Sequence, residues 1–154
     1  MSWYPDLGTV TLIDEGPHVR AVGWLAAKGW FSPKKSFPTG ETSIEFLLRL
    51  YQFAKHWADS TEALGWGLFL GVHGCELCDK FQSSGNFGVP AGELLYVAPE
   101  MIAHYVEVHQ YCPPAEFITA VMNSPLPGTE EYRTAVEPFR KLHEQLMKEK
   151  YEIL

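Results

Sequence analysis

Two pairs of metal-binding side chains are the most chemically specific feature of this chain. Cys75 and Cys78 are separated by two residues, and His104 and His109 are separated by four. A tight turn between two such cysteines aims both sulfurs the same way, so that one metal ion can bind both. The spacing Cys-x2-Cys followed by His-x4-His is typical of a structural zinc site. The sequence therefore predicts that these four residues bind zinc.

The spacing of the two histidines does not decide whether both of them bind the metal. Five residues turn about 140° around an ideal α-helix, so His104 and His109 do not share a helical face. Either the helix loosens in its last turn, or another side chain replaces one of the two histidines. His73 and Cys112 are the available substitutes, and a glycine follows His73 directly.

Other interpretations of the same residues remain open. A Cys-x-x-Cys dithiol could be redox-active, but such a motif normally opens a long helix, and Ser83-Ser-Gly85 interrupts any helix here. The cysteines could also be buried free thiols. The knuckle from Cys75 to Cys78 is similar to that of HNH-type nucleases, although those enzymes need polar or basic surroundings to hold a phosphodiester.

A zinc-dependent hydrolase is the main alternative from a different functional class. A catalytic zinc keeps one coordination position for water, so three protein ligands suffice. His73, Cys75 and Cys78 could form such a triad, and Glu76 or Glu107 could act as the base.

Charge and composition exclude several classes of partner. The formal net charge is −7, and no Lys or Arg occurs between Lys80 and Arg133. Because nucleic-acid binding requires cations that neutralise phosphates, we expect no nucleic-acid partner. No apolar run approaches the ~18 residues that span a bilayer, and residues 1–6 have no basic or apolar signal region. The three cysteines, an odd number, argue against a secreted disulfide framework, so we expect a cytoplasmic protein without membrane association.

The hydrophobic pattern predicts a single α+β domain over residues 1–154, with small antiparallel strands and hairpins around a central buried helix. We expect a core over 1–124, in which the zinc knuckle over 71–112 is an insertion, and a C-terminal helix over 129–150. The expected elements are a hairpin of strands 9–13 and 19–25, a helix over 44–58, a buried strand over 65–72, strands 86–89 and 93–98, a helix from about 99 that ends before 113, and a helix over 114–122. Knuckle, hairpin and helix then follow one another as in treble-clef zinc modules.

Three local patterns refine these elements. Thr42-Ser-Ile-Glu45 predicts a capping box at the start of the central helix, whose apolar residues occupy most of its circumference and indicate covering neighbours on several sides. Pro138 is expected to kink or split the last helix. The long loop over 26–42 carries Trp30 and Phe31 beside Lys34, so it either plugs the core or forms an aromatic interaction surface.

The chain resembles an uncharacterised family of small bacterial proteins of unknown function. The segments that carry the resemblance are Trp3 to Gly8, Val19 to Leu25, His73 to Cys78 and Gly85 to Phe117. The resemblance covers roughly the first 125 residues and implies no activity and no catalytic residues.

Together these observations predict a binding or regulatory module with a structural zinc site, whose ligand is a protein or a small molecule. The alternative is a zinc-dependent hydrolase or HNH-like metalloenzyme with an open metal position.

Overall fold

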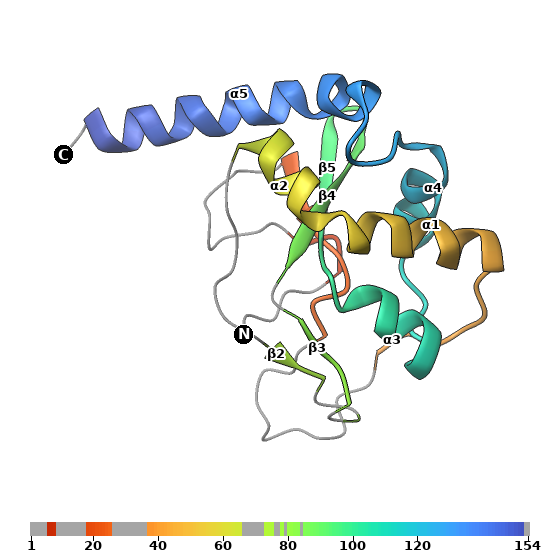
Figure 1. Cartoon of the computed structure of the whole chain (residues 1–154). Helices are drawn as coiled ribbons and strands as arrows, with labels where there is room; N and C mark the ends of the chain where they lie inside the picture. Colours follow the sequence, from red (N-terminus) through yellow and green to blue (C-terminus); the bar gives the residue numbers. More distant parts are fainter. Residues whose placement is uncertain are drawn as a thin grey trace.

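The computed structural model describes residues 6–8, 18–25, 37–65, 73–75, 78, 80–83 and 85–152 (Figure 1). In chain order the elements are β1 (Val19–Ala21), α1 (Ile44–Lys55), α2 (Trp57–Leu64), β2 (His73–Gly74), β3 (Gln82–Ser83), β4 (Asn86–Ala91), β5 (Leu94–Pro99), α3 (Ile102–His109), α4 (Ala115–Asn123) and α5 (Glu130–Glu152). Five helices and a small three-stranded mixed sheet make an α+β fold, as the sequence predicts.

The three-stranded sheet has the order β1-β5-β4, with β5 in the centre. β4 and β5 form an antiparallel hairpin, in which Val89 pairs with Tyr96, whereas β1 runs parallel to β5, with Val19 opposite Leu95. Most residues of β4 and β5 are buried regardless of the face they occupy. These strands therefore need cover on both faces, which explains their nearly continuous apolar sequence. Pro90 is accommodated in β4 because that strand is at an edge of the described sheet.

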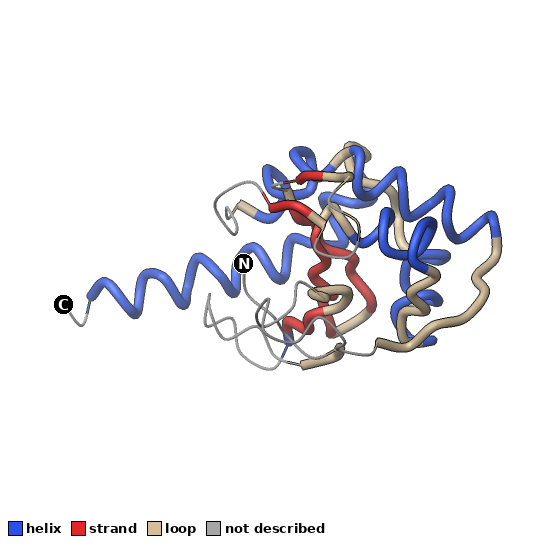
Figure 2. The backbone as a smooth tube through the Cα atoms, turned by 90° about the horizontal axis from the view of Figure 1, so that it is seen from below, coloured by secondary structure: helices blue, strands red, loops and turns tan. Residues whose placement is uncertain are grey.

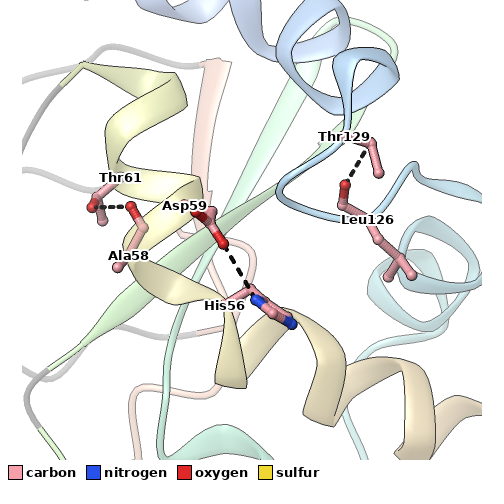
Figure 3. Close-up of polar contacts among 6 residues, drawn as sticks. All are labelled: His56, Ala58, Asp59, Thr61, Leu126 and Thr129. Carbon is pink, nitrogen blue, oxygen red and sulfur yellow. Dashed lines mark hydrogen bonds and ion pairs between the residues drawn. The ribbon is translucent and has the colours of Figure 1, made fainter.

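The predicted helix over 44–58 is divided in two. Ser43, and not Thr42, is the N-cap: its hydroxyl accepts a hydrogen bond of 3.1 Å from the Phe46 N–H. α1 ends before His56, whose backbone leaves the helical region, and α2 begins directly after it. The His56 ring lies 3.2 Å from the Asp59 carboxylate, at the junction seen in Figure 3. The sequence shows no Gly or Pro at this break, which is why the pattern did not predict it.

α1 packs against α2, α3, α4 and β4, which gives it the central position that the sequence predicts. Its buried side includes Phe46, Leu50 and Phe53. Its opposite side leaves Ile44 and Leu48 exposed, so the covered arc is narrower than the apolar pattern indicates.

A closed ring of three hydrogen bonds joins α2, β4 and α5 in the core. The Gly88 N–H donates to the Ser60 hydroxyl at 2.9 Å, and the Tyr132 hydroxyl donates to the Gly88 carbonyl at 2.6 Å. The Ser60 and Tyr132 hydroxyls lie 2.6 Å apart, and Ser60 donates here because the only hydroxyl proton of Tyr132 is already donated to the Gly88 carbonyl. Each polar group in the ring is thereby satisfied although it is buried.

α5 is one continuous helix, although Pro138 lies inside it. Thr129 caps its start as predicted: the hydroxyl accepts from the Tyr132 N–H and donates to the Leu126 carbonyl at 2.7 Å (Figure 3). The predicted split at Pro138 is wrong, whereas the other predicted outcome, a kink, stays a prediction. Pro138 is exposed, so water can reach the carbonyl that the proline leaves without a donor. Figure 2 shows the second half of α5 extending away from the sheet toward the C-terminus.

Several predicted features lie outside the described residues: strand 9–13, most of strand 65–72, and the loop residues Trp30, Phe31 and Lys34. Within the described part, the partner of β1 is β5. No helix among the described residues has the length and apolar character that crossing a membrane requires.

We predict that Tyr132→Phe destabilises the protein by about 1–3 kcal/mol, because the buried Gly88 carbonyl loses the hydroxyl donor and the Ser60 hydroxyl proton loses its acceptor. Tyr51→Phe removes a hydroxyl from an exposed side chain, where it bonds to the exposed Glu107, so it serves as the control and should change stability by less than about 0.5 kcal/mol. Urea denaturation followed by circular dichroism measures both. Equal effects in the two variants would show that the buried ring contributes no more than an exposed hydroxyl.

Candidate metal centre

A short hairpin places the two cysteines of the knuckle. β2 and β3 pair antiparallel with only two residues each, and Cys75 follows β2 directly. The Cys75 N–H donates to the Phe81 carbonyl at 2.8 Å, which extends the pairing by one step. The Cys78 N–H then donates to the Cys75 carbonyl at 3.4 Å, so the chain turns tightly between the thiols. We call β2, β3 and the loop between them the knuckle hairpin.

The two histidines come from α3, which begins two residues after the end of β5. Ile102, Ala103 and Tyr105 are buried and anchor the helix against the core. The order knuckle hairpin, β4–β5 hairpin, α3 is the treble-clef-like order expected from the sequence.

α3 ends in a wide turn at His109. The N–H groups of Gln110 and Tyr111 both donate to the Tyr105 carbonyl, five and six residues back, where a regular α-helix bonds four residues back. Gln110 adopts a left-handed conformation with φ of 58°, which stops the helix there. The loosening expected from the five-residue histidine spacing is therefore present where the helix ends.

Side chains of the knuckle and of α3 meet in one cluster. The Cys75 Sγ lies 3.5 Å from His109 Nε2, and the Cys78 Sγ lies 3.3 Å from His104 Nε2. One ligand atom from each of the four residues can be chosen so that all lie within 4.8 Å of one another. The two imidazole rings approach edge to face, with centroids 5.1 Å apart.

The environment of this cluster favours the metal-binding form of His104. His104 is almost fully buried and stacks on Phe81, with centroids 4.9 Å apart and planes 10° from parallel. Burial and then the neighbouring His109 lower the pKa of His104, although Glu107 opposes them. A lower pKa keeps the imidazole neutral, with a nitrogen lone pair available to a metal.

The geometry fits a tetrahedral metal ion. Zinc lies about 2.3 Å from thiolate sulfur and about 2.0–2.1 Å from imidazole nitrogen, which places tetrahedral ligand atoms about 3.3–3.8 Å apart. The two sulfur–nitrogen distances of 3.3 and 3.5 Å lie in this range. Two thiolates and two imidazoles are also a donor set that suits zinc. Cys75, Cys78, His104 and His109 could therefore hold one metal ion.

The other residues that the sequence offered as ligands or as a catalytic base do not join the four-residue cluster in the described part of the structure. Cys112 lies outside the cluster: its backbone N–H donates to the Pro38 carbonyl, and its Sγ faces the carbonyl of Pro113. The side chains of His73 and Glu76 lie outside the described residues. Glu107 is on α3 and exposed, close to the cluster.

A groove of about 340 Å³ adjoins the cluster, and the sequence analysis missed it. Its lining residues are Tyr51, Gln52, Ala54, Lys55, Phe81, Glu100, Ala103 and His104. Burial raises the pKa of Glu100, which a hydrogen bond from the Gly85 backbone partly offsets. These residues come from α1, the knuckle hairpin and the start of α3, so no local pattern connects them. In the sequence, the only indication that two of these residues lie together is the four-residue helical spacing of Tyr51 and Lys55, and this spacing does not predict a groove.

The family model described as "Domain of unknown function (DUF7919)" matches residues 2–122, and the chain belongs to this family. The match covers every element up to α4 and ends before α5. No curated protein and no solved structure matches the chain.

We predict that the purified protein contains one equivalent of metal, and that Cys75→Ala abolishes this binding. Cys112→Ala removes a thiol outside the cluster and should retain the full equivalent. Elemental analysis after gel filtration measures both variants. Loss of metal from Cys112→Ala, or its retention by Cys75→Ala, would contradict the assignment of the cluster.

Proposed function

We propose that this member of the DUF7919 family is a cytoplasmic binding or regulatory module built around a structural zinc ion. The observation that carries the proposal is the convergence of two thiols and two imidazoles within 4.8 Å. Four protein ligands complete the coordination of zinc and leave no position for water, which is the arrangement of structural sites.

The mechanical role of the zinc is to fix the knuckle hairpin to α3. Each strand of the hairpin is two residues long, and an isolated two-stranded hairpin is marginally stable at best. Structural zinc in isolated fingers contributes ~10–16 kcal/mol, ample to hold such a segment in place. Most residues of the apolar core around β4, β5 and α1 are not metal ligands, although Cys75 lies in this core and Cys78 packs against it.

A partner of this module is a protein or a small molecule. Net charge of −7 and the absence of Lys and Arg from residues 81–132 oppose binding to phosphate backbones. No disulfide joins Cys75, Cys78 or Cys112 in the described part of the chain, which suits a reducing compartment.

A zinc-dependent hydrolase or HNH-like metalloenzyme is the second candidate. Cys78 and His109 are only half-buried, so solvent approaches this side of the cluster. If one of these ligands gave way to water, Glu107 on α3 would be the nearby candidate for the general base. The two candidates differ in the number of protein ligands, which is four in the structural site and three, with a water molecule in the fourth position, in the catalytic site.

X-ray absorption at the zinc edge separates the two candidates. We expect a first shell of two sulfur and two imidazole nitrogen atoms in the wild-type protein. Replacement of one of these by a light oxygen ligand would remove the purely structural assignment and favour the hydrolase.

Removal of the metal by a chelator should lower the melting temperature strongly but leave most of the helical circular dichroism. α1 and α5 are held by apolar contacts, and α5 also by the hydrogen-bond ring. Of the metal ligands, Cys75 lies in this apolar core and Cys78 packs against it, but most of the core residues are not ligands. Hydrogen exchange should accelerate between residues 73 and 112, above all in the knuckle hairpin. Complete loss of helical signal on chelation would instead show that zinc nucleates the entire fold.

A further inference from the structure

Exposed apolar side chains gather on one side of the molecule. Of the five large apolar side chains that are exposed among the described residues, four lie on α1 and α3: Ile44, Leu48, Tyr51 and Val108. Leu48 and Val108 expose 59% and 51% of their surface. We call these four residues the docking face.

The helical geometry makes this face continuous. Ile44, Leu48 and Tyr51 follow one another at spacings of four and three residues, so they form one stripe along α1. α3 packs against α1, and the Tyr51 hydroxyl is hydrogen-bonded to Glu107, the residue before Val108 (Figure 1). The stripe on α1 and the end of α3 are thus neighbours.

The docking face runs into the groove beside the metal cluster. Tyr51 belongs to both, and the groove continues between Lys55, Ala103 and Phe81. Its volume of about 340 Å³ is of the size that holds a large side chain. A groove beside an apolar stripe suits an interface hot spot, where one anchor side chain inserts and the surrounding contacts exclude water.

Acidic groups border the face on both helices. Glu45 and Glu107 are both exposed, the first beside Ile44 on α1 and the second beside Val108 on α3. Arg49 turns away from the face, because its guanidinium donates to the carbonyls of Val121 and Ser124 at the end of α4. Lys55 is at the groove end of the stripe. The rim of the face is therefore mainly negative.

We propose that the docking face binds a basic amphipathic segment of a partner protein, with an apolar side chain of that segment in the groove. Apolar positions at helical spacing with a polar rim match the way an amphipathic helix binds a groove. Lys and Arg of the partner complement Glu45 and Glu107 across the rim.

The acidic rim also decides against the alternatives. A second copy of the chain would offer only one cation of its own face among the described residues, Lys55, to the two carboxylates Glu45 and Glu107, so it complements the rim less well than a basic segment does. This inference deepens the proposed function, because zinc bound to His104 would fix the Phe81 and His104 wall of the groove.

The first experiment places a photo-crosslinking amino acid at position 48 in cells of the source organism. Position 122 is the matched control, because Met122 on α4 is also a large exposed apolar residue, as exposed as Tyr51. We expect a protein adduct at position 48 that is absent at position 122, with the crosslinked segment basic and amphipathic. Equal adducts at both positions, no adduct at position 48, an adduct with a second copy, or a crosslinked segment without basic residues would each overturn the proposal.

The second experiment measures binding of a synthetic peptide of the crosslinked segment by fluorescence anisotropy. Leu48→Glu should weaken binding at least about tenfold, whereas Met122→Glu should leave it within about twofold. Glu45→Lys should weaken binding and reduce its salt dependence, and Glu62→Lys on α2 is the matched control for that charge change. Unchanged binding by Leu48→Glu would overturn the proposal.

Zinc content measured on the same samples separates failure of this inference from failure of the proposed function. If the protein contains its full equivalent of zinc but Leu48→Glu does not weaken binding, the docking-face proposal alone is wrong. If the protein contains no zinc but Leu48→Glu still weakens binding, the proposal of a structural zinc site alone is wrong. Cys75→Ala should weaken the peptide's binding if the zinc fixes the groove wall.

Discussion

The contact between two thiols of the knuckle hairpin and two imidazoles of α3 joins a hairpin of very short strands to a helix that is anchored in the core. The hairpin has two residues in each strand, and one further hydrogen bond, from Cys75 to Phe81, closes its end. A segment this short does not stay ordered by its own pairing. α3, in contrast, is anchored by buried side chains and continues directly from the central strand of the sheet. A metal ion shared between them would transfer the rigidity of the core to the hairpin.

The rest of the fold fixes the position of α3, so that its two histidines face the knuckle hairpin. β5 is paired on both sides, and the buried ring of Ser60, Gly88 and Tyr132 connects the neighbouring strand β4 to α2 and α5. α1 covers the core with one side and packs against α3, so the position of the histidines is set by apolar packing before any metal binds. The opposite side of α1, with Leu48 in its middle, has no such neighbour among the described elements and remains exposed.

Local patterns predicted most elements and the four side chains that the structure brings together, Cys75, Cys78, His104 and His109. Short-range rules predict the hairpin of β4 and β5, the helix α3 and the turn that brings the two cysteines together. The five-residue spacing of the histidines also indicated that the end of α3 would have to loosen for both to bind one metal. The break between α1 and α2 at His56 could not be predicted, because no proline or glycine occurs there. The parallel pairing of β1 with β5 joins residues more than seventy positions apart, which no local pattern specifies. The continuity of α5 depends on the exposure of Pro138, and the groove depends on three separate segments, so both required the tertiary structure.

The central claim is that one metal ion is held by four protein ligands that connect the knuckle hairpin to α3. Substitution with cadmium-113 and proton–cadmium correlation spectroscopy test it most directly, because scalar coupling passes only through the ligand bonds. The account predicts correlations from one cadmium resonance to the β-protons of Cys75 and Cys78 and to the ring protons of His104 and His109. Coupling to only three of these residues, or to His73 in place of one of the α3 histidines, would contradict it.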